Sequence, residues 1–293
     1  MKPANDEGNI NMVQGTYNES NVDLLNIEIQ LLLEAIFLRY GYDFRNYSKA
    51  HIKRRILHRL GISMLSSVTQ LQDRILRERA FFIDFLDDLS INVTEMFRDP
   101  EFYKSLRETI IPKLRTYAYF KIWHAGCSTG EEVFSLSILL KEEGLLDRCQ
   151  VYATDFNRNV LEIAREGVYQ KSDIEQYEKN YQLSGGSKKL SDYYKSRYGS
   201  VIFDKELSNK IVFADHNLVT DNVFADVNLI LCRNVLIYFE KELQDKVIGL
   251  FYDSLVPSGI LCLGTKESIK FSRHGNLFEI VDEKQRIYKK KIM

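Results

Sequence analysis

The stretch HAGCSTGEE, residues 124–132, decides the fold, because it joins a short apolar run to a helical pattern. The run that leads into it, KIWHA at 121–125, has the length of a buried strand, and residues 130–143 repeat apolar side chains at helical spacing. A strand, a loop and a helix in this order are typical of α/β sheets, which bind ligands at the carboxyl ends of their strands. We therefore expect a ligand site at this loop.

The glycines and acids of the loop have two interpretations. Gly126 and Gly130 would let a ligand approach the backbone closely. Thr129 and Glu132, however, also have the spacing of a capping box, which only closes the first turn of a helix. The loop lacks both the GxGxxG pattern of dinucleotide sites and the glycine-lysine pattern of P-loops. Taken alone, it predicts a ligand without identifying it.

A carboxylate follows at the end of the next expected strand, VYATD, which closes on Asp155. An acid in this place can accept hydrogen bonds from both hydroxyls of a ribose, although aspartate is also a common helix N-cap. Loop and carboxylate together favour an adenosine-containing ligand.

The rest of this half continues the alternation of strands and helices, which predicts a parallel sheet with helices on both faces. We expect strands at 121–125, 150–154, 227–232, 260–263 and 286–290, and helices at 130–143, 157–165 and 241–255. Residues 190–213 do not fit the alternation. We interpret them as an antiparallel insertion of two or three strands with a tight turn at Gly199-Ser200.

The first hundred residues show only helical periodicity. Helices are expected from Leu24 to the stop at Gly41 and at 48–60, 68–77, 79–91 and 101–111. We predict a disordered polar tail at 1–20, a helical domain at 21–116 and the α/β domain at 117–293. No apolar run has the length of a membrane span, and the first residues lack the apolar core of a signal peptide.

Composition narrows the class of protein. The chain has 293 residues, 45% of them hydrophobic, and a formal net charge of −1, so it is not a generally basic nucleic-acid binder. No two of its four cysteines have CxxC spacing, so we expect no metal site and a reducing, cytoplasmic setting. The neutral total hides a basic segment at 39–59 and an acidic one at 78–101.

Three further strings hold polar residues at expected turns: NVTEMFRDP at 92–100, HNL at 216–218 and CRNVLIYF at 232–239. Arg233 and Asn234 would stand at the carboxyl edge of the sheet, where side chains meet ligands. Tyr238 could face the same site, although a lone tyrosine is more often a core residue. Asn92, Thr94 and Arg98 could simply be turn, cap and surface residues.

Five strings, NVTEMFRDP, AGCSTGEE, ATDFN, HNL and CRNVLIYF, occur in an order and spacing that resemble the chemoreceptor glutamate methyltransferases, the CheR family. The resemblance covers the chain from about residue 22. It implies an α/β, Rossmann-like S-adenosylmethionine-dependent methyltransferase domain with an N-terminal all-helical domain and a small inserted antiparallel β-subdomain. The implied reaction is methyl transfer from S-adenosylmethionine to glutamate side chains of chemotaxis receptors, with S-adenosylhomocysteine as product.

The resemblance also implies roles for single residues. Cofactor contacts are expected from Asn92, Thr94, Arg98, Glu132, Asp155, Asn217, Leu218, Arg233 and Asn234. Arg98 and Tyr238 match residues that position the acceptor. Val133-Phe134 departs from the Pro-Tyr of many relatives, which affects helix packing more than cofactor contact. His124 stands where small residues are common and receives no role.

The basic helix at 48–60 has two interpretations. Arg54, Arg55 and Arg59 form a solvated face that pairs with the acidic segment, or they dock the acidic methylation helices that the resemblance implies as substrate. The β-subdomain likewise either stabilises the domain or, as in some family members, captures a receptor's C-terminal peptide by strand addition. The competing functions are a scaffold without catalysis and a methylase of nucleic acid or small molecules.

Overall fold

The structure is a computed structural model that describes residues 19–90 and 93–292, and it divides into two compact units. The first comprises residues 1–91 and 238–243, and the second comprises residues 92–237 and 244–293. The predicted boundary at 116/117 is therefore wrong. The segment before β1 belongs to the second unit because α6 (Pro100–Ser105), the π-helical turn Leu106–Ile110 and α7 (Ile111–Leu114) bury apolar side chains in the core around the sheet.

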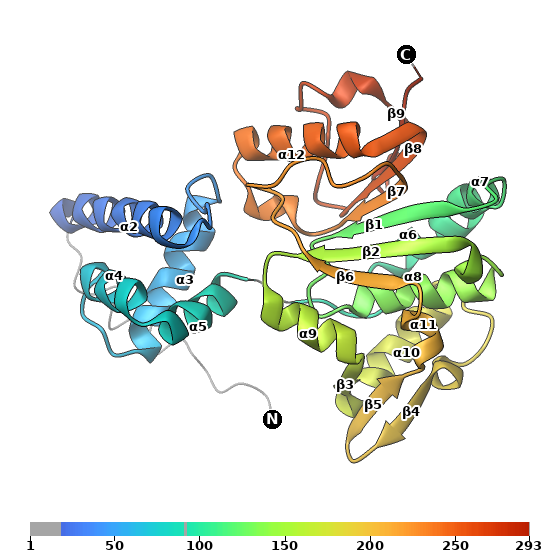
Figure 1. Ribbon diagram of the computed structural model, residues 1–293, viewed down its shortest axis with the longest axis horizontal. Coiled ribbons are helices and arrows are strands. Elements are labelled where there is room, and N and C mark those ends of the chain that lie inside the picture. Colours follow the sequence, from blue (N-terminus) through green and yellow to red (C-terminus); the bar gives the residue numbers. More distant parts are fainter. Residues whose placement is uncertain (1–18, 91–92, 293) are drawn as a thin grey trace. The chain divides into compact units, whose positions relative to one another are not determined.

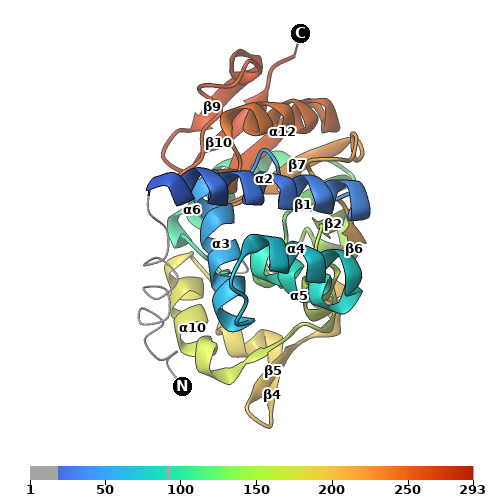
Figure 2. The same ribbon diagram turned by 90° about the vertical axis from the view of Figure 1, so that its left-hand side faces the viewer.

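In the described part of the first unit there are four helices: α2 (Glu19–Tyr40), α3 (Lys49–Ile62), α4 (Val68–Arg77) and α5 (Arg79–Leu89). Figure 2 shows α2 lying across α3. Gly41 ends α2 in the left-handed conformation, with φ at 80°, and donates its N–H to the carbonyl of Phe37 as expected of a C-terminal glycine. Gly61 does not end α3, which continues to Ile62. The apolar periodicity faces inward, with buried Ile36, Ile52, Ile56, Leu71, Ile75 and Phe85.

The second unit is built on a seven-stranded sheet in the order β6-β2-β1-β7-β8-β10-β9 (Figure 1). Its strands are β1 (Phe120–Ala125), β2 (Cys149–Asp155), β6 (Ile211–Asp215), β7 (Val227–Cys232), β8 (Leu255–Leu263), β9 (Phe278–Asp282) and β10 (Ile287–Lys290). The first five in this spatial order pair in parallel, which confirms the prediction for β2, β1, β7 and β8. Strand β10, predicted as part of the parallel sheet, runs antiparallel between β8 and β9. Strand β9 was not predicted from the sequence.

Helices cover both faces of the sheet, and successive side chains of β1 point to alternate faces. Ile122 lies in the core that includes Val133 and Leu136 of α8 (Glu131–Glu142). Trp123 points to the other face, where its ring packs edge-on against Phe251 of α12 (Lys241–Ser254) at 5.5 Å between centroids. Helix α9 (Arg158–Glu166) follows β2, as predicted.

The inserted sheet differs from the prediction in its strands. It has three antiparallel strands in the order β3-β5-β4: β3 (Val168–Gln170), β4 (Tyr194–Arg197) and β5 (Ser200–Phe203). The KIVF strand assigned to it is β6, an edge strand of the main sheet. The hairpin turn falls on Tyr198-Gly199, both at positive φ, one residue earlier than expected. Two helices, α10 (Ile174–Leu183) and α11 (Lys205–Ser208), flank the insertion.

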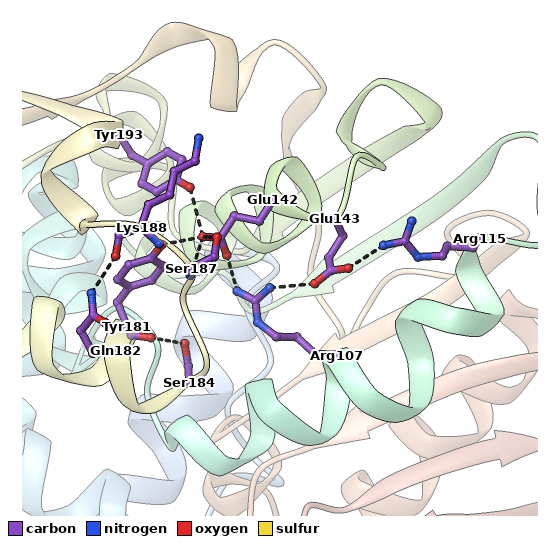
Figure 3. A network of polar contacts seen from close by, with 10 residues as sticks. All are labelled: Arg107, Arg115, Glu142, Glu143, Tyr181, Gln182, Ser184, Ser187, Lys188 and Tyr193. Carbon is purple, nitrogen blue, oxygen red and sulfur yellow. Dashed lines mark hydrogen bonds and ion pairs between the residues drawn. The ribbon is translucent and has the colours of Figure 1, made fainter.

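A polar network joins α8 to this insertion (Figure 3). The carboxylate of Glu142, at the end of α8, accepts hydrogen bonds from the hydroxyls of Tyr181 and Tyr193 and from Ser187, and it pairs with Arg107. Its side chain is only 3% exposed, so these donors compensate for the loss of water. The sequence offered no sign of this network, because its members are far apart in the chain.

Among the residues that the structure describes, none of the helices combines the length and the apolar character that crossing a bilayer requires.

Candidate functional site

The loop after β1 and the end of β2 form one hydrogen-bonded unit. The backbone N–H groups of Gly126 and Cys127 both donate to the carbonyl of Thr154. The carboxylate of Asp155 accepts the N–H of Ser128 at 2.9 Å and that of Asn157 at 3.0 Å. The structure thus brings together the loop and the acid that the sequence selected.

Burial raises the pKa of the Asp155 carboxyl, and the backbone N–H groups of Asn157 and Ser128 oppose that shift. The side chain is 8% exposed. The N–H of Phe156 also bonds to this carboxylate. An ionised carboxylate has about four lone-pair positions, so three amide donors leave an acceptor position for a ribose hydroxyl.

The two glycines of the loop are needed for packing within the protein. A Cβ atom on Gly126 would lie 2.6 Å from the side chain of Val235, and one on Gly130 would lie 2.9 Å from that of Ala164. Both glycines also have positive φ, at 74° and 93°. The fold therefore requires glycine at both positions, and a close approach of a ligand to their backbone stays a prediction.

Glu132 does not form the capping box that its spacing allowed. The hydroxyl of Thr129 donates instead to Glu131, at 2.7 Å. Glu131 is buried as well, and burial raises the pKa of its carboxyl. It is a candidate that the sequence analysis passed over, although it stands beside Glu132 in the same string.

A buried ionic cluster joins the ends of β1 and β7. Arg233, whose side chain is fully buried, donates to Glu132 at 3.1 Å and to Asp99 at 2.7 Å. Its guanidinium carbon lies 4.1 Å from the ring centroid of Phe102, a cation–π contact. His124, which had no assigned role, lies 3.7 Å from the Glu132 carboxylate.

The opposite charges of Glu132 and Arg233 keep both groups ionised despite their burial. Burial alone would raise the pKa of Glu132, but Arg233 and His124 outweigh it and hold that pKa at about 2. Burial lowers the pKa of Arg233 less than Glu132 and the other neighbouring groups raise it. Glu132 and Arg233 are therefore an ion pair at neutral pH.

The string at 92–100 is anchored to the same cluster. The N–H of Phe97 donates to the hydroxyl of Ser135 on α8, and Arg233 donates to the carbonyl of Arg98 at 3.3 Å. The guanidinium of Arg98 itself donates to the carbonyl of Val93 at 2.9 Å. Thr94 is half-buried, and Asn92, the remaining candidate of this string, lies outside the described residues.

The other candidate cofactor residues end neighbouring strands. The N–H of His216 donates to the carbonyl of Asp155, which places Asn217 and the buried Leu218 just beyond that acid. The side-chain oxygen of Asn217 accepts the N–H of Val219. Asn234 follows Arg233 in the left-handed conformation, with φ at 62°.

The described site fits a ligand that carries hydrogen-bond donors and acceptors. Within the described residues, the buried Oδ1 of Asn234 and both ring nitrogens of His124 have no hydrogen-bond partner. A buried polar atom without a partner costs free energy unless a ligand or water satisfies it. An acceptor at Asn234 and a carboxylate at Asp155 suit the ammonium and a ribose hydroxyl of S-adenosylmethionine.

Tyr238 and the basic helix lie in the first unit. The carbonyl of Tyr238 accepts the N–H of Ser48 at 2.8 Å, and its ring packs edge-on against His51 of α3. Arg54 is exposed and Arg55 is half-buried. Arg59 pairs with Asp88 and donates to the carbonyl of Asp84, so the alternative of pairing with the acidic segment is confirmed for this residue.

Fold and site together define the class of S-adenosylmethionine-dependent methyltransferases. The family model "CheR methyltransferase, SAM binding domain" matches residues 92–287, and "CheR methyltransferase, all-alpha domain" matches residues 27–90. The chain belongs to the CheR methyltransferase family, and the family and fold class that the sequence predicted are confirmed.

Curated relatives agree with this assignment. The chain is 50% identical over 273 residues to the Pseudomonas putida protein named "Putative methyltransferase Cher3", covering 93% of this chain and 99% of the relative. It is 28% identical to the "Chemotaxis protein methyltransferase" of Salmonella typhimurium, with 84% and 85% covered. For the protein of the same name in Borreliella burgdorferi the identity is 26%, with 90% and 96% covered.

Proposed function

We propose that this cytoplasmic enzyme methylates glutamate side chains of chemotaxis receptors and so forms glutamate methyl esters, the reaction of sensory adaptation. The main support for the proposal is that the family's strings meet at one edge of the sheet. There Asp155 accepts a hydrogen bond from Ser128 of the loop, and Arg233 forms an ion pair with Glu132. The test is to incubate the protein with labelled S-adenosylmethionine and receptor-containing membranes. Label should reach the receptors as a base-labile ester, whereas cofactor binding without transfer would favour a scaffold.

The chemistry needs little from the protein beyond alignment. S-adenosylmethionine supplies a methyl group activated on a sulfonium. The acceptor carboxyl, with an ordinary pKa near 4.3, is already an anion at neutral pH, so no general base is required. We assign Asp155, Asn217, Leu218, Arg233 and Asn234 to holding the cofactor, together with Asn92, Thr94 and Glu132. Arg98 and Tyr238 are assigned to orienting the acceptor.

The hydroxyl of Tyr238 is assigned to a hydrogen bond with the acceptor carboxylate. We expect Tyr238→Phe to lower kcat about 10- to 100-fold, because a hydrogen bond to a charged group contributes about 1.5–3 kcal/mol. The affinity for S-adenosylhomocysteine, measured by calorimetry, should stay unchanged.

Tyr47→Phe is the matched control for this variant, since Tyr47 packs on the neighbouring Phe239 in the same unit. The control should leave kcat unchanged. If Tyr238→Phe reduced turnover and cofactor affinity equally, Tyr238 would be a cofactor residue instead.

The exposed Arg54 and the half-buried Arg55 of α3 are assigned to receptor docking. Arg54 and Arg55 carry this assignment better than Arg59, because Arg59 is committed to Asp88 within the unit. Charged residues on a rim act mainly by steering an oppositely charged partner, and salt screens that attraction. An acidic methylation helix is such a partner.

Charge reversal tests the docking surface. We expect Arg54→Glu/Arg55→Glu to lower kcat/KM for receptor methylation about tenfold at low salt, with a smaller effect as salt rises. The control Arg77→Glu/Arg79→Glu makes the same change in net charge at exposed positions of α4 and α5. Equal effects of both pairs, or the same effect at every salt concentration, would refute docking on α3.

We also assign the inserted sheet a partner, a receptor's C-terminal peptide. Strand β4 is an edge strand, and its Lys195 and Arg197 are exposed. An extended peptide can add to such an edge through main-chain hydrogen bonds. Titration with receptor C-terminal peptides would distinguish this role from a purely stabilising one.

A further inference from the structure

The loop after β8 holds the buried carboxylate of Glu267, which is not one of the assigned cofactor or acceptor residues. Glu267 is 4% exposed. One of its oxygens accepts the N–H groups of Gly264 and Asn234, at 2.5 and 3.0 Å. The other accepts the N–H of Ile237 at 3.3 Å, and the N–H of Leu236 also bonds to the carboxylate.

Three of these four donors, Asn234, Leu236 and Ile237, lie in one short turn, residues 234–237. It begins directly after Arg233, which is bonded to Glu132, and it ends directly before Tyr238. One carboxylate therefore fixes the stretch of chain between a residue assigned to the cofactor and the residue assigned to the acceptor. Hydrogen bonds from N–H groups to an ionised carboxylate are about twice as strong as neutral ones.

The residues around the Glu267 carboxylate are closely packed. A Cβ atom on Gly264 would lie 2.8 Å from the nitrogen of Asn234 and 2.9 Å from the carboxylate of Glu267. Asn234 itself occupies the left-handed region, which asparagine tolerates better than most residues other than glycine. Its N–H is bonded to Glu267 in this conformation.

We propose that Glu267 is a positioning residue for methyl transfer, whose carboxylate holds the turn 234–237 so that Asn234 is correctly placed at the cofactor site. The proposal rests on the proposed function of the site. Glu267 acts through the backbone of this turn and touches neither cofactor nor acceptor. Its loss should therefore affect binding and turnover in protein that is still folded.

The test compares Glu267→Gln with Glu142→Gln. Glutamine keeps the size of the side chain but replaces one acceptor oxygen by an NH2 group that would face N–H donors. Glu142 is the matched control, because it is a buried carboxylate with several donors at the opposite end of α8, about 15 Å from Glu132 by helix length. Both variants should lower the thermal unfolding midpoint.

Only Glu267→Gln should weaken binding of S-adenosylhomocysteine or lower kcat on receptor membranes, in either case at least about tenfold, one hydrogen-bonded contact being sufficient for that factor. If both variants lost stability and neither changed Kd or kcat, Glu267 would be structural only and the proposal would be overturned. Calorimetry with S-adenosylhomocysteine needs no receptor, so a failure of the receptor assay for the wild type would be recognised separately.

Glu267→Asp provides the second variant if the glutamine variant does not fold. It keeps the charge but withdraws the carboxylate by one methylene, so the N–H groups at the far end of the turn lose their acceptor. We expect intermediate stability with impaired cofactor binding. Wild-type Kd and kcat in this variant would contradict the proposal.

Discussion

Replacement of Arg233 by methionine should lower the free energy of unfolding by about 3–5 kcal/mol, because it leaves the buried carboxylate of Glu132 without its partner. The side chain of Arg233 is 0% exposed and that of Glu132 is 8% exposed, so water cannot replace the lost contact. Methionine preserves most of the apolar volume against Phe102, which separates the effect of charge from that of packing. Urea unfolding at pH 7 measures the change.

The pH dependence of stability identifies the pair as the cause. The pKa of Glu132 is about 2 in the folded protein and 4.5 in the reference state, so the carboxylate stabilises the fold above pH 4.5. That stabilisation declines as the pH falls from 4.5 towards 2, and Arg233→Met should lose this part of the profile. Glu132→Gln/Arg233→Met should be less destabilised than the two single changes combined.

An exposed pair serves as the control for Arg233. Arg158 pairs with Asp215 at 2.7 Å, but its side chain is 75% exposed, so Arg158→Met should cost less than about 1 kcal/mol. Equal losses at Arg158 and Arg233 would show that burial does not set the strength of the buried pair. The comparison uses the same substitution at two levels of exposure.

Local signals in the sequence were sufficient for the core of the fold. The loop at 126–130, α4 and the parallel strands were predicted because their glycines and apolar periodicity depend on neighbours in the chain. The boundary between the two units and the exact strands of the insertion were not predicted. Whether the strand at 211–215 joins one sheet or another is decided by its pairing with Val151 to Asp155, a contact that no local pattern encodes.

The site shows the same division. Asp155 and the loop were predicted because the carboxyl ends of adjacent parallel strands must meet. The pairing of Glu132 with Arg233 was not, since the two residues are 101 positions apart and each had a simpler explanation. Glu267 carried no motif and was missed entirely. Its importance follows only from the four N–H groups that the fold directs at it.

Removal of the Asp155 carboxylate should weaken S-adenosylhomocysteine binding about 10- to 100-fold. A hydroxyl group that donates to a carboxylate contributes about 1.5–3 kcal/mol, and each 1.4 kcal/mol is a factor of ten. Asp155→Ala also removes the acceptor for Ser128 and Asn157, which adds to the loss. Calorimetry with S-adenosylhomocysteine measures the affinity without requiring a receptor.

The neighbouring strand supplies a matched control, because Asp215 of β6 stands in register with Asp155 but is 42% exposed and pairs with Arg158. Asp215→Ala should leave the affinity nearly unchanged. An analogue without ribose hydroxyls then separates the two parts of the effect. It should bind the wild type far more weakly than S-adenosylhomocysteine does, whereas Asp155→Ala should bind both ligands equally. If the variant still discriminated between them, the ribose would be held elsewhere and Asp155 would serve only to order the loop.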